Sequence, residues 1–267
     1  MTLSTDMSIP SDVLQKWAKP GKNEMSKQTY AALRDLLLEK LNNPQPNIYL
    51  QGSYRNSTNV KDNSDIDIVV EYDSNIDVTC LKDYICGRID NAHNFHFTTG
   101  SKTVKYKGLR NQYVPADIVP CVSVRGKTGC VALYDSSKRT MIHNYPKIHI
   151  QNGEDKSGRT DGNSKKAVRM MKNARNHLED RGIKVNVSSF VIECMLYNVP
   201  DGMFSGNESQ ILYNVLDWFN KNRGSIQNMY TQDGKSYLFP GSGSVSDAKQ
   251  FIDDVIDLWN NWEKYQI

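Results

Sequence analysis

The sequence feature that most constrains the fold of this chain is a short segment in which apolar residues alternate in position with two aspartates. Residues 66–72 alternate in the manner of a strand with one apolar face, and Asp65 and Asp67 fall together on its other face. Two carboxylates one pleat repeat apart repel each other, and burying them unpaired is costly, so packing does not account for the pair. A divalent cation between them removes the repulsion. Because hard oxygen ligands suit magnesium, the pattern predicts a Mg2+ site.

A third carboxylate has a matching context. Asp117 is flanked by apolar residues within 113–120, which reads as a second short strand. Two carboxylates from one strand and one from a neighbour would hold two cations. Such a pair of cations stabilises both the attacking and the leaving oxygen of a phosphoryl displacement. The three aspartates are therefore the predicted catalytic and metal-binding residues.

The order of these residues resembles a known family. The motif reads Gly52-Ser53, eleven further residues, Asp65-x-Asp67 and, later, Asp117. This order resembles the polymerase-beta-type nucleotidyltransferase superfamily. With Thr58 and the string 64–67 included, it is most similar to the cGAS/DncV-like nucleotidyltransferases (CD-NTases) and the related oligoadenylate synthases. From the residues alone, the alternative to a catalytic motif is a Gly-Ser turn before a strand with two solvated aspartates.

The resemblance implies a reaction in which a sugar hydroxyl attacks the α-phosphate of a nucleoside triphosphate and pyrophosphate leaves. Asp65 and Asp67 would hold the cation bound to the triphosphate, and Asp117 would join them on the cation that activates the hydroxyl. Mg2+ is the expected cofactor, with Mn2+ as an alternative. Gly52 would let the backbone approach the phosphates, and Ser53, at the start of a short predicted helix, would donate to them.

The 267-residue composition is that of a globular protein, with 38% hydrophobic and 24% charged residues. A net charge of +3 does not indicate a dedicated nucleic-acid binder. The five cysteines are scattered, which favours free thiols, and the N-terminus lacks a signal-peptide pattern. No window approaches the ~20 apolar residues that span a bilayer. We therefore expect a cytoplasmic protein without a membrane partner.

Two halves of different character divide the chain. Residues 1–150 read as an α/β catalytic core with a mixed sheet and flanking helices, and residues 151–267 read as a helical C-terminal lobe. Residues 147–166, polar and rich in glycine, read as a loop or linker. The expected fold is thus α+β, a two-lobed nucleotidyltransferase fold with the active site in the cleft between the lobes. We further expect the N-terminal helices to pack with the C-terminal lobe.

The predicted helix over 163–181 carries a polar stripe opposite its apolar one. The stripe contains Lys165, Arg169, Lys172 and Asn176. Composition alone favours a solvated surface. The resemblance instead assigns Lys172 to the phosphates, and Ser189, with Ser188 as its rival, to a further phosphate contact at the start of the next helix. An aromatic residue is expected to stack on the base, and three candidates stay open: Tyr54, Tyr113 and Tyr197.

The resemblance implies a synthase that makes a cyclic di- or trinucleotide second messenger from ATP and other nucleoside triphosphates. Its implied setting is bacterial anti-phage (CBASS-type) signalling, with a separate effector that binds the product. The chain lacks the zinc insertion of the animal DNA sensor, so a nucleic-acid activator is not indicated. The alternatives are a transferase with a non-cyclic product (a linear oligonucleotide, a tRNA end or a nucleotidylated protein) and an inactive nucleotide-binding sensor. Base preference, linkage, ring size, activating signal and oligomeric state stay open.

Overall fold

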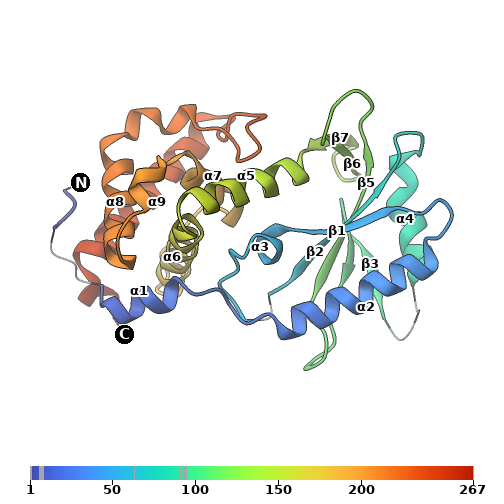
Figure 1. Ribbon diagram of the computed structural model, residues 1–267, viewed down its shortest axis with the longest axis horizontal. Coiled ribbons are helices and arrows are strands. Elements are labelled where there is room, and N and C mark those ends of the chain that lie inside the picture. Colours follow the sequence, from blue (N-terminus) through green and yellow to red (C-terminus); the bar gives the residue numbers. More distant parts are fainter. Residues whose placement is uncertain (1, 6–8, 63, 91, 93–94, 267) are drawn as a thin grey trace. The chain divides into compact units, whose positions relative to one another are not determined.

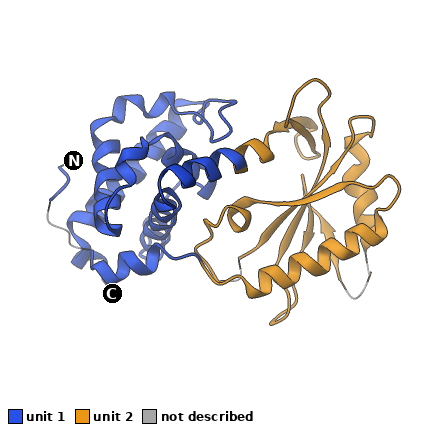
Figure 2. Ribbon diagram, in the orientation of Figure 1, with its two compact units in different colours: residues 1–20, 151–267 blue, residues 21–150 orange. Residues whose placement is uncertain are grey.

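The computed structural model describes residues 2–5, 9–62, 64–90, 92 and 95–266. The chain forms two compact units (Figure 2). Unit 1 combines residues 1–20 with residues 151–267, and unit 2 consists of residues 21–150. Each unit has a hydrophobic core of its own.

Unit 2 contains a mixed sheet (Figure 1). Its strands within the described residues are β1 (Asn47–Gln51), β2 (Ile66–Tyr72), β3 (Phe97–Thr99), β4 (Val104–Tyr106), β5 (Ala116–Ser123), β6 (Val131–Asp135) and β7 (Thr140–Asn144). The order is β1-β2-β5-β4-β3, and β6 pairs with both β5 and β7. β2 and β5 are parallel, whereas the other pairs are antiparallel. The predicted mixed sheet is confirmed.

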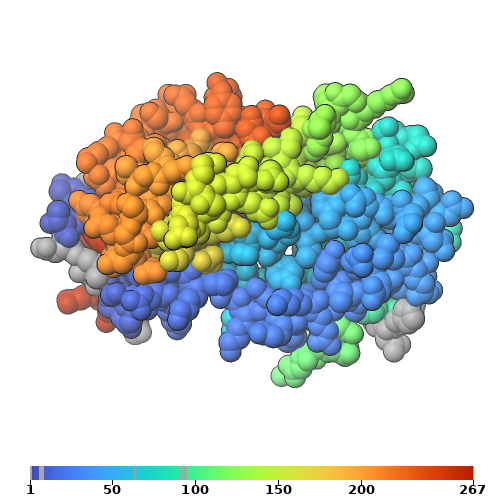
Figure 3. All heavy atoms as spheres, in the orientation of Figure 1, coloured from blue at the N-terminus to red at the C-terminus, as the bar shows by residue number. Residues whose placement is uncertain are grey.

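The alternation in β2 separates the two faces of the sheet. Ile66, Ile68 and Val70 join the main core under two helices, α2 (Glu24–Lys40) and α4 (Val78–Ile89). Val69 points the other way, into a smaller apolar cluster. α2 contributes leucines to the main core because its apolar residues recur at helical spacing. Its outward side chains form a band on the surface of the unit (blue, Figure 3).

Unit 1 is helical, which confirms the predicted C-terminal bundle. Its helices are α1 (Ser11–Trp17), α5 (Pro146–Arg159, which begins in unit 2), α6 (Asn163–Glu179), α7 (Ser189–Asn198), α8 (Glu208–Lys221) and α9 (Ser242–Asn260), with 3-10 turns η2 (Asp201–Phe204), η3 (Arg223–Asn228) and η4 (Trp262–Tyr265). α6 contacts α1, α7, α8 and α9, so it is central in the bundle. None of the helices in the described ranges is long and apolar enough to cross a membrane.

The prediction of a loop or linker over 147–166 is wrong except at residues 160–162, because α5 extends to Arg159 and α6 begins at Asn163. Pro146 begins α5, and proline is favoured at the first helical position. Tertiary contacts then compensate for the low helix propensity of its glycines. Lys156 is buried and donates to the carbonyl of Val199 at 2.7 Å and to Asp201 at 2.9 Å. A composition-based reading misses such contacts.

Candidate active site

Asp67 and Asp117 lie side by side in the sheet. They are register partners in the parallel pair of β2 and β5, so their carboxylates share one face, on strands about 4.8 Å apart. Their strand neighbours Ile66 and Ile118 point into the main core on the opposite face. Asp65 is exposed and immediately precedes β2. The structure thus brings two of the three predicted catalytic carboxylates together and places the third at the adjoining strand end.

A row of polar side chains crosses the sheet at this level. Gln51 of β1 pairs with Asp67, Asp117 pairs with Lys105 of β4, and Lys105 pairs with Thr98 of β3. Residues directly opposite each other share a face, so these five side chains, here called the polar row, follow one another on the face of the aspartates. The sequence analysis did not single out Gln51 or Lys105. Only strand register reveals them.

Gly52 forms the turn that follows β1. Its φ of 75° lies in the left-handed region, and a Cβ at this position would overlap the carboxylate of Asp67. Glycine is therefore required both by the backbone and by the neighbouring side chain. Ser53 follows in the short helix α3 (Gly52–Arg55), where its carbonyl accepts a hydrogen bond from the amide of Thr58 at 2.9 Å. The predicted phosphate-binding pair thus adjoins the aspartates.

Gly52→Ala is expected to lower nucleotide transfer about a hundredfold, because the new methyl group displaces Asp67 and misplacement by about 1 Å has this scale of cost. The backbone alone costs about 1–2 kcal/mol. Gly126→Ala is the matched control, since Gly126 has a φ of 77° and an added methyl group there would meet no atom within 4 Å. Initial rates and denaturant unfolding are compared for both variants. Equal activity in the two would contradict this role for Gly52.

The carboxylates of the site have the chemistry of magnesium ligands. Within the described ranges, no group of three His, Cys, Asp or Glu side chains is gathered as a metal site. Asp67 and Asp117 nevertheless offer two adjacent hard oxygen donors on one face. Mg2+ typically takes one or two protein carboxylates and completes its shell with water and substrate phosphates. The donor set therefore fits a cation that is held jointly with a nucleotide, with Asp65 as the predicted third contributor.

Lys172 does not lie on a solvated stripe. Its side chain is 2% exposed and its Nζ lies 2.5 Å from the Glu193 carboxylate of α7. Arg169, on the same stripe, is also buried and donates to the carbonyl of Ala18 at 2.6 Å. Burial lowers the pKa of Arg169 to about 10 and also lowers that of Lys172, where Glu193 partly opposes the effect. The reading of a solvated surface is wrong, because α6 is central in its bundle and is covered on this side too.

The two serines at the start of α7 have different partners. Ser188 caps the helix, and its Oγ accepts from the amide of Val191 at 3.3 Å. The Oγ of Ser189 accepts from Arg175 at 3.1 Å. The phosphate roles of Lys172 and Ser189 stay predictions.

The three tyrosines proposed for base stacking also have protein partners. Tyr54 packs against the main core of unit 2, where burial raises its pKa. Tyr113 lies 5.4 Å from the ring of Phe95, and Tyr197 lies 5.6 Å from the ammonium of Lys156. These contacts do not select one of the three for a base.

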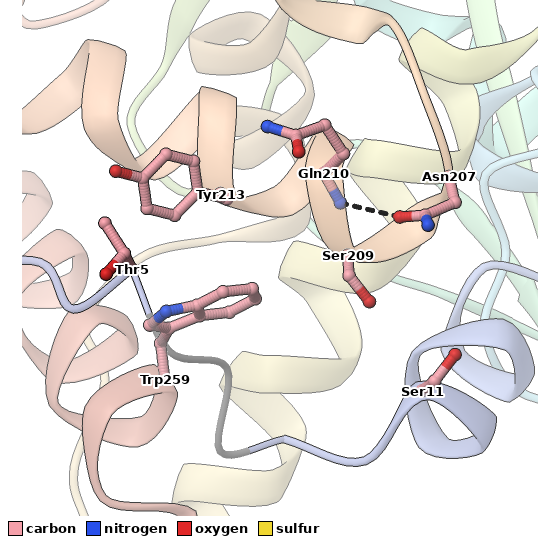
Figure 4. A pocket seen from close by; sticks show the side chains of 7 residues that line it. All are labelled: Thr5, Ser11, Asn207, Ser209, Gln210, Tyr213 and Trp259. Atoms are coloured by element: carbon pink, nitrogen blue, oxygen red, sulfur yellow. Dashed lines mark hydrogen bonds between the residues drawn. The ribbon is translucent and has the colours of Figure 1, made fainter.

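A cavity of about 490 Å³ lies within unit 1 (Figure 4). It is lined by Thr5, Ser11, Asn207, Ser209, Gln210, Tyr213 and Trp259. Asn207 is the N-cap of α8, and its side chain accepts from the amide of Gln210 at 2.9 Å. None of the predicted site residues lines this cavity, so it is separate from the candidate active site.

Comparison with known proteins defines the class. Residues 32–141 match the family model of the nucleotidyltransferase domain, in agreement with the mixed sheet and its aspartates. Residues 151–260 match that of the cGAS/DncV-like nucleotidyltransferase C-terminal helical domain. The chain therefore belongs to the cGAS/DncV-like nucleotidyltransferase family, and the resemblance noted in the sequence is confirmed.

Relatives cover nearly the whole chain. The cyclic UMP-AMP synthase of Rhodothermus marinus is 30% identical over 96% of this chain and 99% of its own length. A cyclic nucleotide synthase of Staphylococcus haemolyticus is 30% identical over 96% of this chain and 100% of its own. The Rhodothermus marinus structure with Apcpp and Upnpp has a TM-score of 0.83, at 28% identity, and covers 95% of this chain and 97% of that one.

A second solved relative is similarly close. The cyclic dinucleotide synthase of Elizabethkingia meningoseptica, with GTP and Apcpp, has a TM-score of 0.82 at 29% identity. The match covers 96% of this chain and 99% of that one. The two-lobed nucleotidyltransferase architecture expected from the sequence is therefore shared with solved members of the family.

Proposed function

We propose that this chain condenses nucleoside triphosphates into a cyclic dinucleotide or trinucleotide second messenger and releases pyrophosphate. The observation that carries the proposal is the pairing of Asp67 with Asp117, directly beside the Gly52 turn. The relatives named above are cyclic nucleotide synthases, and the two solved ones are described with two nucleotides. Their names differ in the bases joined, so the bases used by this chain need measurement.

In the proposed reaction, the oxygen of a sugar hydroxyl forms a bond to the α-phosphorus of the donor, and the bond from that phosphorus to the bridging oxygen of pyrophosphate breaks. The hydroxyl proton passes to solvent. Gly52 and Ser53 would position the donor phosphates, and Asp65, Asp67 and Asp117 would hold Mg2+, or Mn2+ in its place. The cation would supply charge neutralisation and a more acidic hydroxyl. A second bond of the same kind would close a dinucleotide ring, and a third would close a trinucleotide ring.

The setting of this activity is also a proposal. We place the enzyme in the cytoplasm, where nucleoside triphosphates are available, with a separate effector that binds the product in anti-phage signalling. Family membership supports this setting. A linear oligonucleotide is the second candidate product, because the same first bond forms in both cases.

The first experiment incubates the purified chain with all four nucleoside triphosphates and Mg2+, then Mn2+, and identifies products by mass spectrometry. An Asp65→Ala/Asp67→Ala variant is the control. The expected result is a phosphatase-resistant cyclic product that the control does not make. If only linear products form, the nucleotidyltransferase activity stands, but the proposal that the product is cyclic is contradicted. Product formation by the control would overturn the assignment of the aspartates.

A further inference from the structure

Lys105 lies beside Asp117 on the face that carries the aspartates. The two residues are register partners in the antiparallel pair of β4 and β5. Val104 and Tyr106, on either side of Lys105, are buried in the main core, so Lys105 points to the opposite face. It is exposed, and it is the one cation of the polar row. The residue that carries this positive charge thus pairs with Asp117, at one end of the predicted carboxylate pair.

The side chain of Lys105 runs over Gly100. A Cβ at Gly100 would lie 3.0 Å from Cε of Lys105, which is closer than van der Waals contact allows. Gly100 belongs to the turn between β3 and β4, which pair at Thr99 and Val104. The absence of a side chain there leaves room for the stem of the lysine across the neighbouring strand. The end of the lysine side chain therefore lies near the turn between β3 and β4, on the side of Asp117 that is remote from β1.

The two sides of the carboxylate pair are chemically different. Gly52 and Ser53, the predicted contacts of the donor phosphates, follow β1 on the side of Asp67. In phosphoryl transfer the attacking and leaving oxygens are roughly in line. With the donor phosphates at the Gly52 turn, as proposed, the pyrophosphate would leave toward that turn, and the attacking hydroxyl would approach from the other side, which is the side of Asp117 and β4. This is where Lys105 lies.

We propose that Lys105 binds a phosphate of the acceptor nucleotide, the substrate that supplies the attacking hydroxyl. The inference rests on the proposed function and deepens it. An acceptor that is itself a nucleoside triphosphate keeps its own triphosphate during the first bond, so its negative charge requires a cation separate from the donor site. An exposed lysine beside Asp117 provides one. Lys105 takes no part in bond making, and its effect is on acceptor binding.

The alternative reading is a cross-strand ion pair between Lys105 and Asp117 that supports the sheet. Such pairs are worth little at exposed positions. The two readings differ in one measurable respect. If Lys105 binds an acceptor phosphate, its removal matters only for acceptors that carry phosphate. If it acts through Asp117, its removal affects all acceptors equally.

The test uses Lys105→Met, with Lys127→Met, an exposed lysine of the turn between β5 and β6, as the matched control. A 2′,3′-dideoxynucleoside triphosphate of each base serves as a donor that cannot act as acceptor. The acceptor is offered as triphosphate, monophosphate or nucleoside. We expect Lys105→Met to lower kcat/KM about tenfold for the triphosphate acceptor, the scale of one charge-assisted hydrogen bond, and to leave the nucleoside unchanged. An equal loss with every acceptor, or no loss, would overturn the proposal.

A binding measurement separates this inference from the proposed function. Titration calorimetry with each of the four α,β-methylene nucleoside triphosphates, in the presence of Mg2+, reports nucleotide sites without turnover. We expect Lys105→Met to weaken one of two sites about tenfold, while Lys127→Met weakens neither. A wild-type chain that binds these analogues at both sites but forms no product from the natural nucleoside triphosphates would contradict the synthase and retain the acceptor site. Unchanged binding in Lys105→Met, or no second site in the wild type, would overturn the role of Lys105.

Discussion

Asp117→Asn is expected to lower nucleotide condensation by about a thousandfold or more while leaving the unfolding free energy within about 1 kcal/mol of the wild type. Charge stabilisation by a catalytic cation is worth several kcal/mol, and each 1.36 kcal/mol is a factor of ten in rate. The unfolding free energy changes little because two small electrostatic changes oppose each other. The variant loses the repulsion from Asp67 on one side and the attraction of Lys105 on the other.

The measurement pairs initial rates of product formation with denaturant unfolding. Asp73→Asn is the matched control, because Asp73 is an exposed aspartate just beyond the end of β2. It should retain full activity and full stability. A stability loss of several kcal/mol in Asp117→Asn would show that the carboxylate supports the sheet. An active Asp117→Asn would remove this residue from the catalytic group.

Local patterns in the sequence were sufficient for the strand that carries the aspartates. The alternation of residues 66–72 gave the two faces correctly, since Ile68 and Val69 lie in different clusters. Such local patterns do not predict the register between strands. That Asp67 lies beside Asp117, and Asp117 beside Lys105, depends on pairings between segments far apart along the chain. A lone exposed lysine in a predicted strand acquires significance only when its neighbours are known.

Periodicity also failed where a helix is surrounded on all sides. Composition alone predicts a solvated surface for the stripe of Arg169 and Lys172, because its residues are charged. In the structure the charges are buried with specific partners, a carbonyl for Arg169 and Glu193 for Lys172. Paired buried charges cannot be distinguished from surface charges by composition, since the partners come from different helices.

Glu193→Gln is expected to destabilise the chain by about 3–5 kcal/mol, because it removes the carboxylate that is paired with the buried ammonium of Lys172. The side chains of Lys172 and Glu193 are 2% and 8% exposed, so water does not replace the lost partner. Arg175 and Arg169 add repulsion that already lowers the pKa of Lys172. The double variant Lys172→Met/Glu193→Gln, which removes both charges, should regain most of this loss.

The loss of stability in Glu193→Gln should also depend on pH. Burial lowers the pKa of Lys172 in the folded chain, and removal of Glu193 lowers it further, since that carboxylate opposes the burial effect. The unfolded chain then binds more protons than the folded one between this lowered pKa and the ordinary lysine value of about 10.4, so stability rises with pH across that window. Urea unfolding at pH 7 and pH 9.5 measures it. The deficit relative to the double variant should shrink at the higher pH. A deficit that is the same at both pH values, or a double variant as unstable as Glu193→Gln, would show that lost packing rather than the lost carboxylate beside Lys172 is responsible.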